Sequence, residues 1–197
     1  MEFPEPLTRA DLPAMDAITL LKNDHKAVKR LFRQFEKLGD SAVKSRRELV
    51  DKMIEELSIH AAIEEQLFYP AARESVPDAE DHVLESLEEH HVVKWTLSEL
   101  VDMKGDEERF EAKVTVLIES VEHHAQEEED DLFPKVRKGM GRKALAELGA
   151  AMEKAKKTAP TRPHPRAPDT PPGNVAAAKV TGLADRARKV GKQKVGR

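Results

Sequence analysis

The 197-residue sequence contains no cysteine, one tryptophan and one tyrosine. The absence of cysteine excludes disulfides, thiolate metal sites and cysteine nucleophiles, so a metal would have to be held by nitrogen and oxygen. The shortage of aromatic residues beside 36% charged residues is more typical of amphipathic helices than of a β-sandwich. No stretch approaches the roughly 18 apolar residues of a membrane span, and the N-terminus lacks the basic and apolar regions of a secretory signal. We therefore expect a cytoplasmic protein.

The charge is divided unevenly along the chain, whose net charge is −4. Residues 156–197 carry 11 Lys and Arg against two Asp, and residues 1–155 carry 22 against 35, so a body of −13 precedes a tail of +9. A proline-rich stretch from Ala159 to Gly173 predicts an extended linker at the boundary. Residues 175–197 could form a frayed helix but have too few apolar residues for a core. We predict that residues 158–197, the linker and basic tail, are largely disordered.

Capping and helix-breaking residues predict an all-α protein. Residues 1–15 hold three prolines and predict an irregular lead-in. Four long helices are expected, from Asp16 to about Leu38, Ser41 to about Ser75, Pro77 to about Lys104 and Asp106 to about Lys138, with a short fifth over about 142–156. Pro70 and Pro134 should bend or end the second and fourth. Because connections of two to four residues make consecutive helices antiparallel neighbours, residues 16–157 should form an up-down-up-down four-helix bundle.

One pattern of metal-binding side chains occurs twice. It consists of a histidine, a second histidine 34 or 35 residues later, a glutamate four residues after that, and a proline six residues after the glutamate. The copies are His25, His60, Glu64 and Pro70, then His90, His124, Glu128 and Pro134. Residues four apart on a helix reach the same site, and imidazole with carboxylate suits iron, manganese or zinc. The doubled pattern predicts a binuclear metal centre inside the bundle.

Helical faces distinguish the predicted ligands from neighbouring histidines. His90 and His124 lie on apolar faces, whereas the adjacent His91 and His123 have mostly polar neighbours. A buried network of hydrogen-bonded His and Glu without metal is the alternative. So many polar groups in one core would be destabilising without a shared partner, which favours metal. The remaining histidines are expected to be solvated or beside the site: His82, His91, His123 and His164.

These residues resemble a known family. The segments that carry the resemblance are Asp24-His25-Lys26, His60-x-x-x-Glu64 with Phe68-Tyr69-Pro70, Glu89-His90-His91, and His124-x-x-x-Glu128 with Leu132-Phe133-Pro134. Over about residues 16–140 the sequence is similar to the bacterial hemerythrin-like (HHE cation-binding) domain. The resemblance implies a non-haem di-iron centre with a bridging oxo or hydroxo group. It would place His25 and His60 on one iron, His90 and His124 on the other, and Glu64 and Glu128 as bridges.

The sequence departs from the oxygen carriers of this family at one ligand. Those carriers have a fifth histidine, and the corresponding positions here hold Ser86 and Lys94. One iron should therefore have an open position or take a carboxylate instead. The candidates are Glu56, Glu65 and Glu127, although a solvated Glu56 is the simpler expectation. We likewise expect Lys94 to be exposed and Tyr69 to pack at a helix end, although either could act beside the ligands.

The missing histidine favours redox chemistry or sensing over oxygen transport. The first expected function is binding or turnover of a small oxidant such as dioxygen, peroxide or nitric oxide, in oxidative or nitrosative stress. An enzyme of this kind would be a peroxidase- or catalase-like or nitric-oxide-consuming oxidoreductase, with no catalytic residue apart from the metal centre and an unidentified electron donor. The second is an iron or oxygen sensor whose basic tail contacts nucleic acid or an acidic surface. A metal-free structural bundle is the third.

Overall fold

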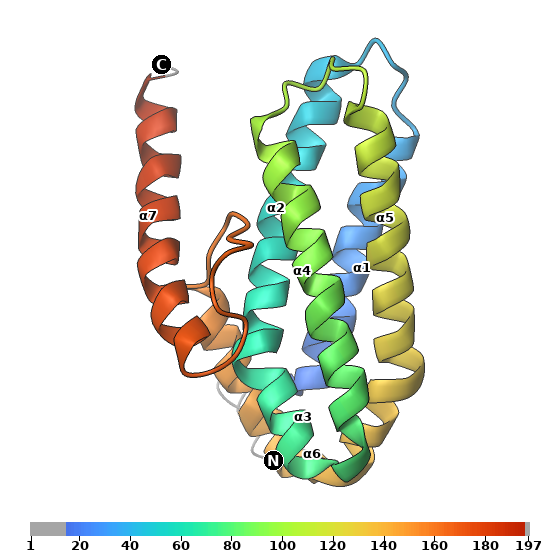
Figure 1. Cartoon of the computed structure of the whole chain (residues 1–197), viewed down its shortest axis with the longest axis vertical. Helices are drawn as coiled ribbons and strands as arrows, with labels where there is room; N and C mark the ends of the chain where they lie inside the picture. Colours follow the sequence, from blue (N-terminus) through green and yellow to red (C-terminus); the bar gives the residue numbers. More distant parts are fainter. Residues whose placement is uncertain (1–14, 196–197) are drawn as a thin grey trace, which may run out of the picture.

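The computed structural model describes residues 15–195, which form helices and no β-strand. Four long helices lie side by side along one axis (Figure 1): α1 (Ala17–Glu36), α2 (Val43–Ile63), α4 (Glu80–Asp102) and α5 (Phe110–Glu127). Contacts join α1 to α2, α2 to α4, α4 to α5, and α5 to α1. The predicted all-α bundle is confirmed. The predicted lead-in, residues 1–15, lies outside the described residues apart from Met15.

The sequence predicted an N-terminal cap for α1 and another for α5, and the structure contains only the first. The carboxylate of Asp16 accepts a hydrogen bond from the backbone N–H of Thr19 at 3.0 Å, so the predicted cap of α1 is confirmed. Asp106 was wrongly predicted to cap the fourth long helix, which begins at Phe110 without a side-chain cap. The carboxylate of Glu107 instead accepts the backbone N–H groups of Lys104 and Gly105. These hydrogen bonds hold the connection before α5 in a turn, so that α5 begins four residues after Asp106.

A π turn follows α2 and another follows α5, where the sequence predicted a bend or a helix end. The turn η1 (Glu64–Phe68) leads into α3 (Tyr69–Ser75), and η3 (Glu128–Leu132) leads into α6 (Phe133–Lys156). Pro70 and Pro134 each lie two residues after the last residue of a π turn. A proline has no backbone N–H to donate to the carbonyl of the residue four positions earlier. The preceding turn can therefore widen to i→i+5 bonding without losing a bond it would otherwise make.

Helix α6 closes one end of the bundle. The predicted short helix over residues 142–156 is its second half, which follows a kink at Gly141, where φ is 75°. Two apolar clusters fill the core. One lies at the α6 end and includes Phe68 and Phe133; the other fills the opposite end and includes Phe32 and Leu97. Along each long helix, the predicted histidine falls between residues of the two clusters, so the histidines form a polar layer between two apolar ones.

The C-terminal segment differs from the prediction that it is largely disordered. Residues 173–195 form helix α7 (Gly173–Val195), which reaches the bundle on its α2 side (Figure 1). The carboxylate of Asp185 on α7 is 2% exposed. It accepts the backbone N–H groups of Thr161 and Arg162 and bonds Nε2 of His164, each at 3.1 Å. The composition correctly indicated that this segment lacks a core of its own, but not that it packs on the bundle.

None of the helices in the described part of the chain combines the length and apolar character needed to cross a membrane.

Candidate metal centre

Each long helix contributes one buried histidine to the polar layer. His25, His60, His90 and His124 are 3–6% exposed, while the adjacent His91 and His123 are exposed, as their helical faces predicted. The buried rings form two pairs. Nε2 of His25 lies 3.2 Å from Nε2 of His60, and Nε2 of His90 lies 3.1 Å from Nε2 of His124. The pairing matches the ligand sets implied by the sequence resemblance.

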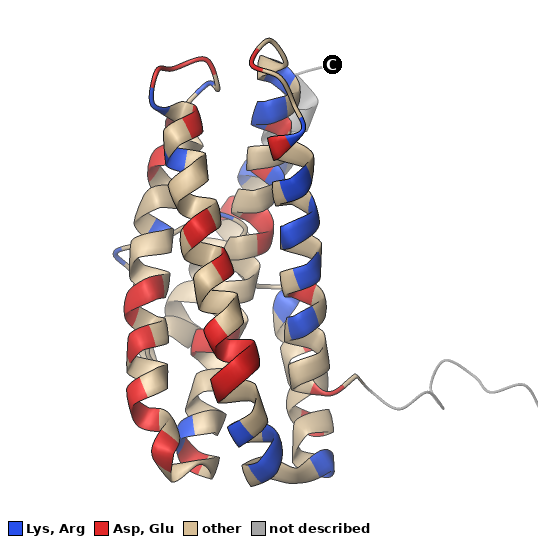
Figure 2. Ribbon diagram, turned by 90° about the vertical axis from the view of Figure 1, so that its right-hand side faces the viewer, with Lys and Arg blue, Asp and Glu red and all other residues tan. Residues whose placement is uncertain are grey.

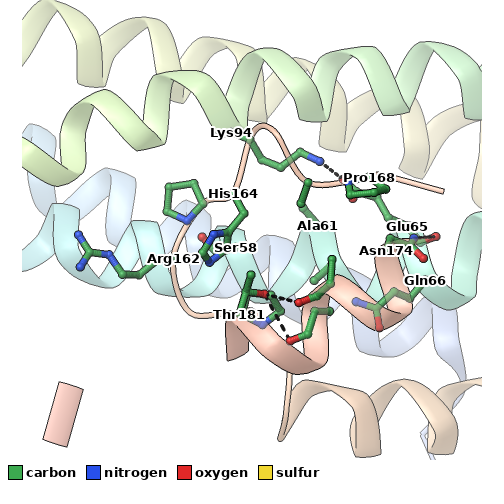
Figure 3. Close-up of a pocket in the computed structure, with 16 residues that line it drawn as sticks. Ser58, Ala61, Glu65, Gln66, Lys94, Arg162, His164, Pro168, Asn174 and Thr181 are labelled. Atoms are coloured by element: carbon green, nitrogen blue, oxygen red, sulfur yellow. Dashed lines mark hydrogen bonds and ion pairs between the residues drawn. The ribbon is translucent and has the colours of Figure 1, made fainter. Parts of the chain in front are cut away.

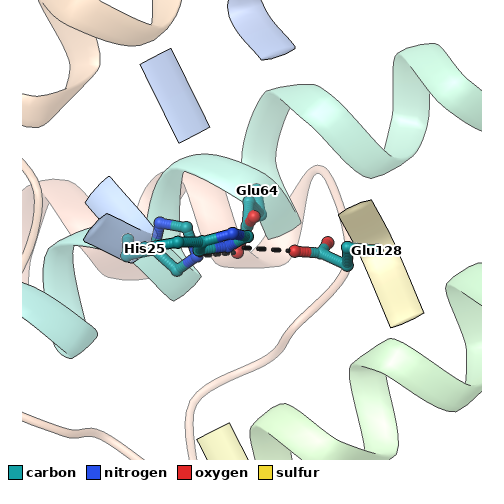
Figure 4. A group of neighbouring side chains, drawn as sticks. His25, Glu64 and Glu128 are labelled. Atoms are coloured by element: carbon teal, nitrogen blue, oxygen red, sulfur yellow. Dashed lines mark hydrogen bonds and ion pairs between the residues drawn. The ribbon is translucent and has the colours of Figure 1, made fainter. Parts of the chain in front are cut away.

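The two glutamates of the repeated pattern lie between the histidine pairs. Oε2 of Glu64 is 3.1 Å from Nε2 of His60 and 3.5 Å from Nε2 of His90. Oε2 of Glu128 is 3.3 Å from Nε2 of His25 and 3.6 Å from Nε2 of His124. Figure 4 shows Glu64 and Glu128 approaching the histidines from different helices. Each glutamate therefore reaches one histidine of each pair, as a bridge between two ions would.

Four further carboxylates lie near the outward-facing Nδ1 atoms of the histidines. Glu129 is 2.9 Å from Nδ1 of His25, Glu65 is 3.0 Å from that of His90, Glu89 is 2.6 Å from that of His124, and Asp24 is 3.6 Å from that of His60. A carboxylate on the second ring nitrogen fixes the orientation of an imidazole and leaves Nε2 free to ligate. All four histidines thus point the same nitrogen inward.

The positions of these carboxylates follow the repeat. Asp24 and Glu89 each precede the first histidine of a copy and lie near the second histidine of the same copy. Glu65 and Glu129 each follow the inner glutamate of one copy and bond a histidine of the other copy. The π turns explain the positions of Glu65 and Glu129. With i→i+5 hydrogen bonds, successive side chains are separated by a smaller angle about the helix axis than in an α-helix. Sequence reasoning assigned these residues no such role, although the doubled Asp-His, Glu-His and Glu-Glu pairs were a visible signal.

Burial and charge shift the pKa values of the inner residues in different directions. Burial lowers the pKa of His60 to about 4. Burial, reinforced by the charge of Glu128, raises the pKa of Glu64 well above its usual value. Burial opposes ionisation of Glu128 too, but the neighbouring His124 and His25 outweigh it and lower its pKa to about 2. One carboxylate of the pair thus tends to hold a proton where a cation is absent.

A metal ion fits this set of atoms. Both oxygens of Glu64 and Oε2 of Glu128 are fully buried and lack hydrogen-bond partners among the described residues. Unpartnered buried carboxylate oxygens are costly unless they bind a cation. Among the described residues, three groups of side chains have ligand atoms close enough to share an ion. Two of them are buried and share Glu64: His25, His60, Glu64 and Glu128, and Glu64, His90 and His124. The third, Glu89, His123 and Glu127, lies at the surface. Their nitrogen and oxygen atoms suit iron, manganese or zinc.

Metal binding should strengthen as the pH rises. The raised pKa of Glu64 means that the metal-free protein keeps a proton there to higher pH than an ordinary glutamate does, and a cation must displace that proton. By mass action, fewer free protons favour the metal-bound state. Titration with Co²⁺ or Zn²⁺ should give a tighter dissociation constant at about pH 8 than at about pH 6. Equal affinities at the two pH values would contradict this expectation.

The position of the absent fifth histidine is not filled by the predicted carboxylates. Glu56 is exposed, Glu127 lies 3.3 Å from the exposed His123, and Glu65 bonds Nδ1 of His90. Tyr69 instead brings an oxygen into the site. Its hydroxyl donates to Oε1 of Glu128 at 3.0 Å and lies 3.3 Å from Nε2 of His90. The expectation that Tyr69 only packs at a helix end was incomplete, because the π turn before it rotates its side chain inward.

Lys94 is also placed differently from the expectation. Its side chain is 12% exposed, and its Nζ lies 2.8 Å from Oε1 of Glu65. Asn174 of α7 donates to the backbone carbonyl of Glu65 at 2.9 Å. Figure 3 shows Lys94, Glu65 and Asn174 around a pocket of about 50 Å³ between the bundle and the C-terminal segment. This segment therefore covers the outer side of the Lys94–Glu65–His90 chain of contacts.

These features define a helical bundle with a buried cluster of four imidazoles and two carboxylates, the arrangement of a metal-binding four-helix protein. Comparison with known families agrees. Residues 16–136 match the model of the Hemerythrin HHE cation binding domain. The chain belongs to this family.

Several relatives are named as uncharacterized proteins. An uncharacterized hemerythrin-like protein of Schizosaccharomyces pombe is 26% identical over 166 residues, which cover 84% of this chain and 81% of that protein. An uncharacterized protein of Mycobacterium tuberculosis is 34% identical over 123 residues, covering 61% of this chain and 71% of that protein. The crystal structure of a hemerythrin HHE cation binding domain-containing protein from Mycobacterium kansasii is 30% identical. It aligns with a TM-score of 0.61 and covers 73% of this chain and 88% of that one.

Proposed function

We propose that this protein holds two iron ions in the bundle and uses them to bind or turn over a small oxidant, such as dioxygen, peroxide or nitric oxide. The observation that carries the proposal is the convergence of four Nε2 atoms with carboxylate oxygens that are buried and unpartnered. His25 and His60 would hold one ion, His90 and His124 the other, and Glu64 and Glu128 would bridge them. Bound iron would supply the electrons for reduction of the oxidant.

The surrounding residues would prepare the site for this chemistry. Burial and the charges of Glu128 and Glu64 raise the pKa of Tyr69 well above its usual value, so its hydroxyl keeps its proton. The hydroxyl donates this proton to Oε1 of Glu128 and lies 3.3 Å from Nε2 of His90, so it would be close to an oxidant that needs a proton on reduction. The apolar clusters above and below exclude water from the layer, which protects reactive species from side reactions.

Anaerobic loading with ferrous iron tests the proposal. We expect two iron ions per chain, and a ferric charge-transfer absorption after addition of dioxygen or peroxide. His124→Ala should lose at least one ion and the absorption, because it removes an inward Nε2. His123→Ala is the matched control: it changes the neighbouring exposed histidine and should keep both. Protein that binds no iron, or variants that bind it equally, would refute the assignment.

A sensor is the second candidate, and one contact favours it. Asn174 of α7 bonds the backbone of Glu65, which in turn bonds a proposed ligand, His90. A change at the metal centre could therefore alter how the C-terminal segment packs. A metal-free structural bundle is less well supported, because it would leave both oxygens of Glu64 buried without a hydrogen bond to any described residue.

A further inference from the structure

An acidic cavity lies between α4 and the π turn η3. Its volume is about 60 Å³, which is room for about four water molecules at roughly 15 Å³ each. None of the seven residues that line it is Lys or Arg, and four are acidic: Glu85, Glu127, Glu128 and Asp131. Carboxylate oxygens are ligands that divalent cations accept readily. The cavity can therefore take a divalent cation together with part of its hydration water.

The cavity extends from the surface to a residue of the proposed metal centre. Glu85 and Asp131 are exposed, whereas Ser86 and Glu128 are 6% and 2% exposed and form its buried end. Oε2 of Glu128 has no hydrogen-bond partner among the described residues and lies 3.3 Å from Nε2 of His25. An ion that reaches this carboxylate has therefore arrived at the histidine layer.

Two carboxylates at the exposed end are available to a cation. Glu127 lies 3.3 Å from Nε2 of His123, but no ion pair joins the exposed Glu85 or Asp131 to any residue that the structure describes. Two unpaired negative charges at one opening raise the local concentration of cations and their association rate.

The surface around the opening is also acidic. Figure 2 shows Asp and Glu gathered on α4 and on α5 with the turn that follows it, while Lys and Arg gather on α1, the helix that continues from the grey N-terminal trace. Residues 127–131 are five consecutive acidic residues. One positive charge opposes them, because Nζ of Lys135 lies 3.3 Å from Nε2 of His82, which lines the cavity.

A second small cavity reaches the same layer but is unsuited to cations. It borders the four buried histidines and exposes only apolar surface. An ion that entered there would lose hydration water without gaining oxygen ligands, which is costly. Of these two cavities, the acidic one is therefore the better path for a cation.

We propose that the acidic cavity is the entry site for the divalent cations of the metal centre. Glu85 and Asp131 attract an ion from solvent, and Glu128 receives it at the buried end. The inference rests on the proposed function in one respect, that ions occupy the histidine layer, and adds how they arrive there. The two exposed carboxylates then affect the rate of loading and leave the number of bound ions unchanged.

Co²⁺ uptake by the metal-free protein tests the proposal, with the visible absorption of bound cobalt followed by stopped flow. The double variant Glu85→Gln/Asp131→Asn should lower the association rate constant about five- to tenfold at roughly 0.01 M salt, and the difference should shrink at about 1 M, where charges are screened. Lys135→Gln removes the opposing charge and should raise the rate about twofold. Each variant should reach the wild-type number of ions and the wild-type final spectrum.

The double variant Glu88→Gln/Glu122→Gln is the matched control. It removes two exposed carboxylates of α4 and α5 that do not line the cavity, so loading should slow less than about twofold. Equal loading rates in the two double variants would overturn the proposal. Fewer bound ions at equilibrium in Glu85→Gln/Asp131→Asn would also overturn it, since these residues would then be ligands. If wild-type protein takes up neither Co²⁺ nor iron, the proposed function fails first and this inference fails with it.

Discussion

Replacing Glu64 with methionine should abolish binuclear metal binding and, at the same time, stabilise the metal-free protein. The side chain of Glu64 is completely buried, its oxygens lack hydrogen-bond partners among the described residues, and it belongs to both of the buried candidate metal groups. Without it, we expect at most one ion per chain. Methionine of similar volume removes a polar group that is buried without a hydrogen bond to any described residue, and burying such a group costs about 1–3 kcal/mol. Relief of this cost corresponds to about 2–4 °C in Tm for each kcal/mol in a chain of this size.

Metal analysis and thermal unfolding with and without chelator measure the two effects. Glu56→Met is the matched control, because Glu56 is exposed two turns earlier on the same helix. It should leave metal content and both melting temperatures unchanged. Loss of an ion in Glu56→Met would instead support the earlier expectation that Glu56 replaces the absent histidine. A Glu64→Met protein that is less stable than wild type without metal would show that its carboxylate has a stabilising partner in the folded state.

The helical pattern and the inward histidines could be predicted because both depend on local periodicity. The residues around His90 and His124 are apolar at helical spacing, and the adjacent His91 and His123 lack that environment. Burial in a bundle follows from this difference alone. The pairing of histidines across helices came from the family resemblance, since spacing along the chain does not say which helices are neighbours.

The finer parts of the site depend on backbone geometry that periodicity does not encode. A regular helix through Glu64 would direct Glu65 and Tyr69 elsewhere, so the assumption of α-helix missed both. The signal was Pro70, which is incompatible with an ordinary turn before it. The second copy, with Pro134 after Glu128, repeats the same signal. A proline six residues after an inward glutamate, found twice, is better interpreted as a π turn than as a bend.

The C-terminal segment was misjudged because its stability comes from contacts distant in sequence. Its low apolar content correctly excludes an independent core. Asp185, however, satisfies two linker N–H groups and His164, and Asn174 bonds the bundle through Glu65. These are polar contacts between segments at least 21 residues apart. Composition indicates how much apolar surface a segment can bury by itself. It does not indicate whether a segment distant in sequence forms hydrogen bonds with it.

Placing valine at Gly182 should release this segment from the bundle. A Cβ atom at Gly182 would lie 2.2 Å from the backbone oxygen of Thr158, so α7 must move away from the linker. Overpacking of this kind costs about 1–3 kcal/mol, which would raise the population of the undocked segment by about 5- to 150-fold. Valine is a better helix former than glycine, so a loss would not reflect helix propensity. Limited trypsin digestion should show faster cleavage after Arg166, because proteolysis follows the open population.

Ala184→Val is the control for this substitution, since Ala184 is exposed on the same helix and has room for valine. It should be cleaved at the wild-type rate, and equal cleavage of the two variants would show that the contact at Gly182 does not hold the segment.

In the iron-loaded Gly182→Val protein, the ferric absorption should also shift. Undocking removes the Asn174 bond from Glu65 and exposes the Lys94–Glu65 pair to water, and water weakens the influence of that pair on His90. A faster cleavage without a spectral shift would separate the two roles: the segment would be docked by Gly182 yet have no influence on the metal centre.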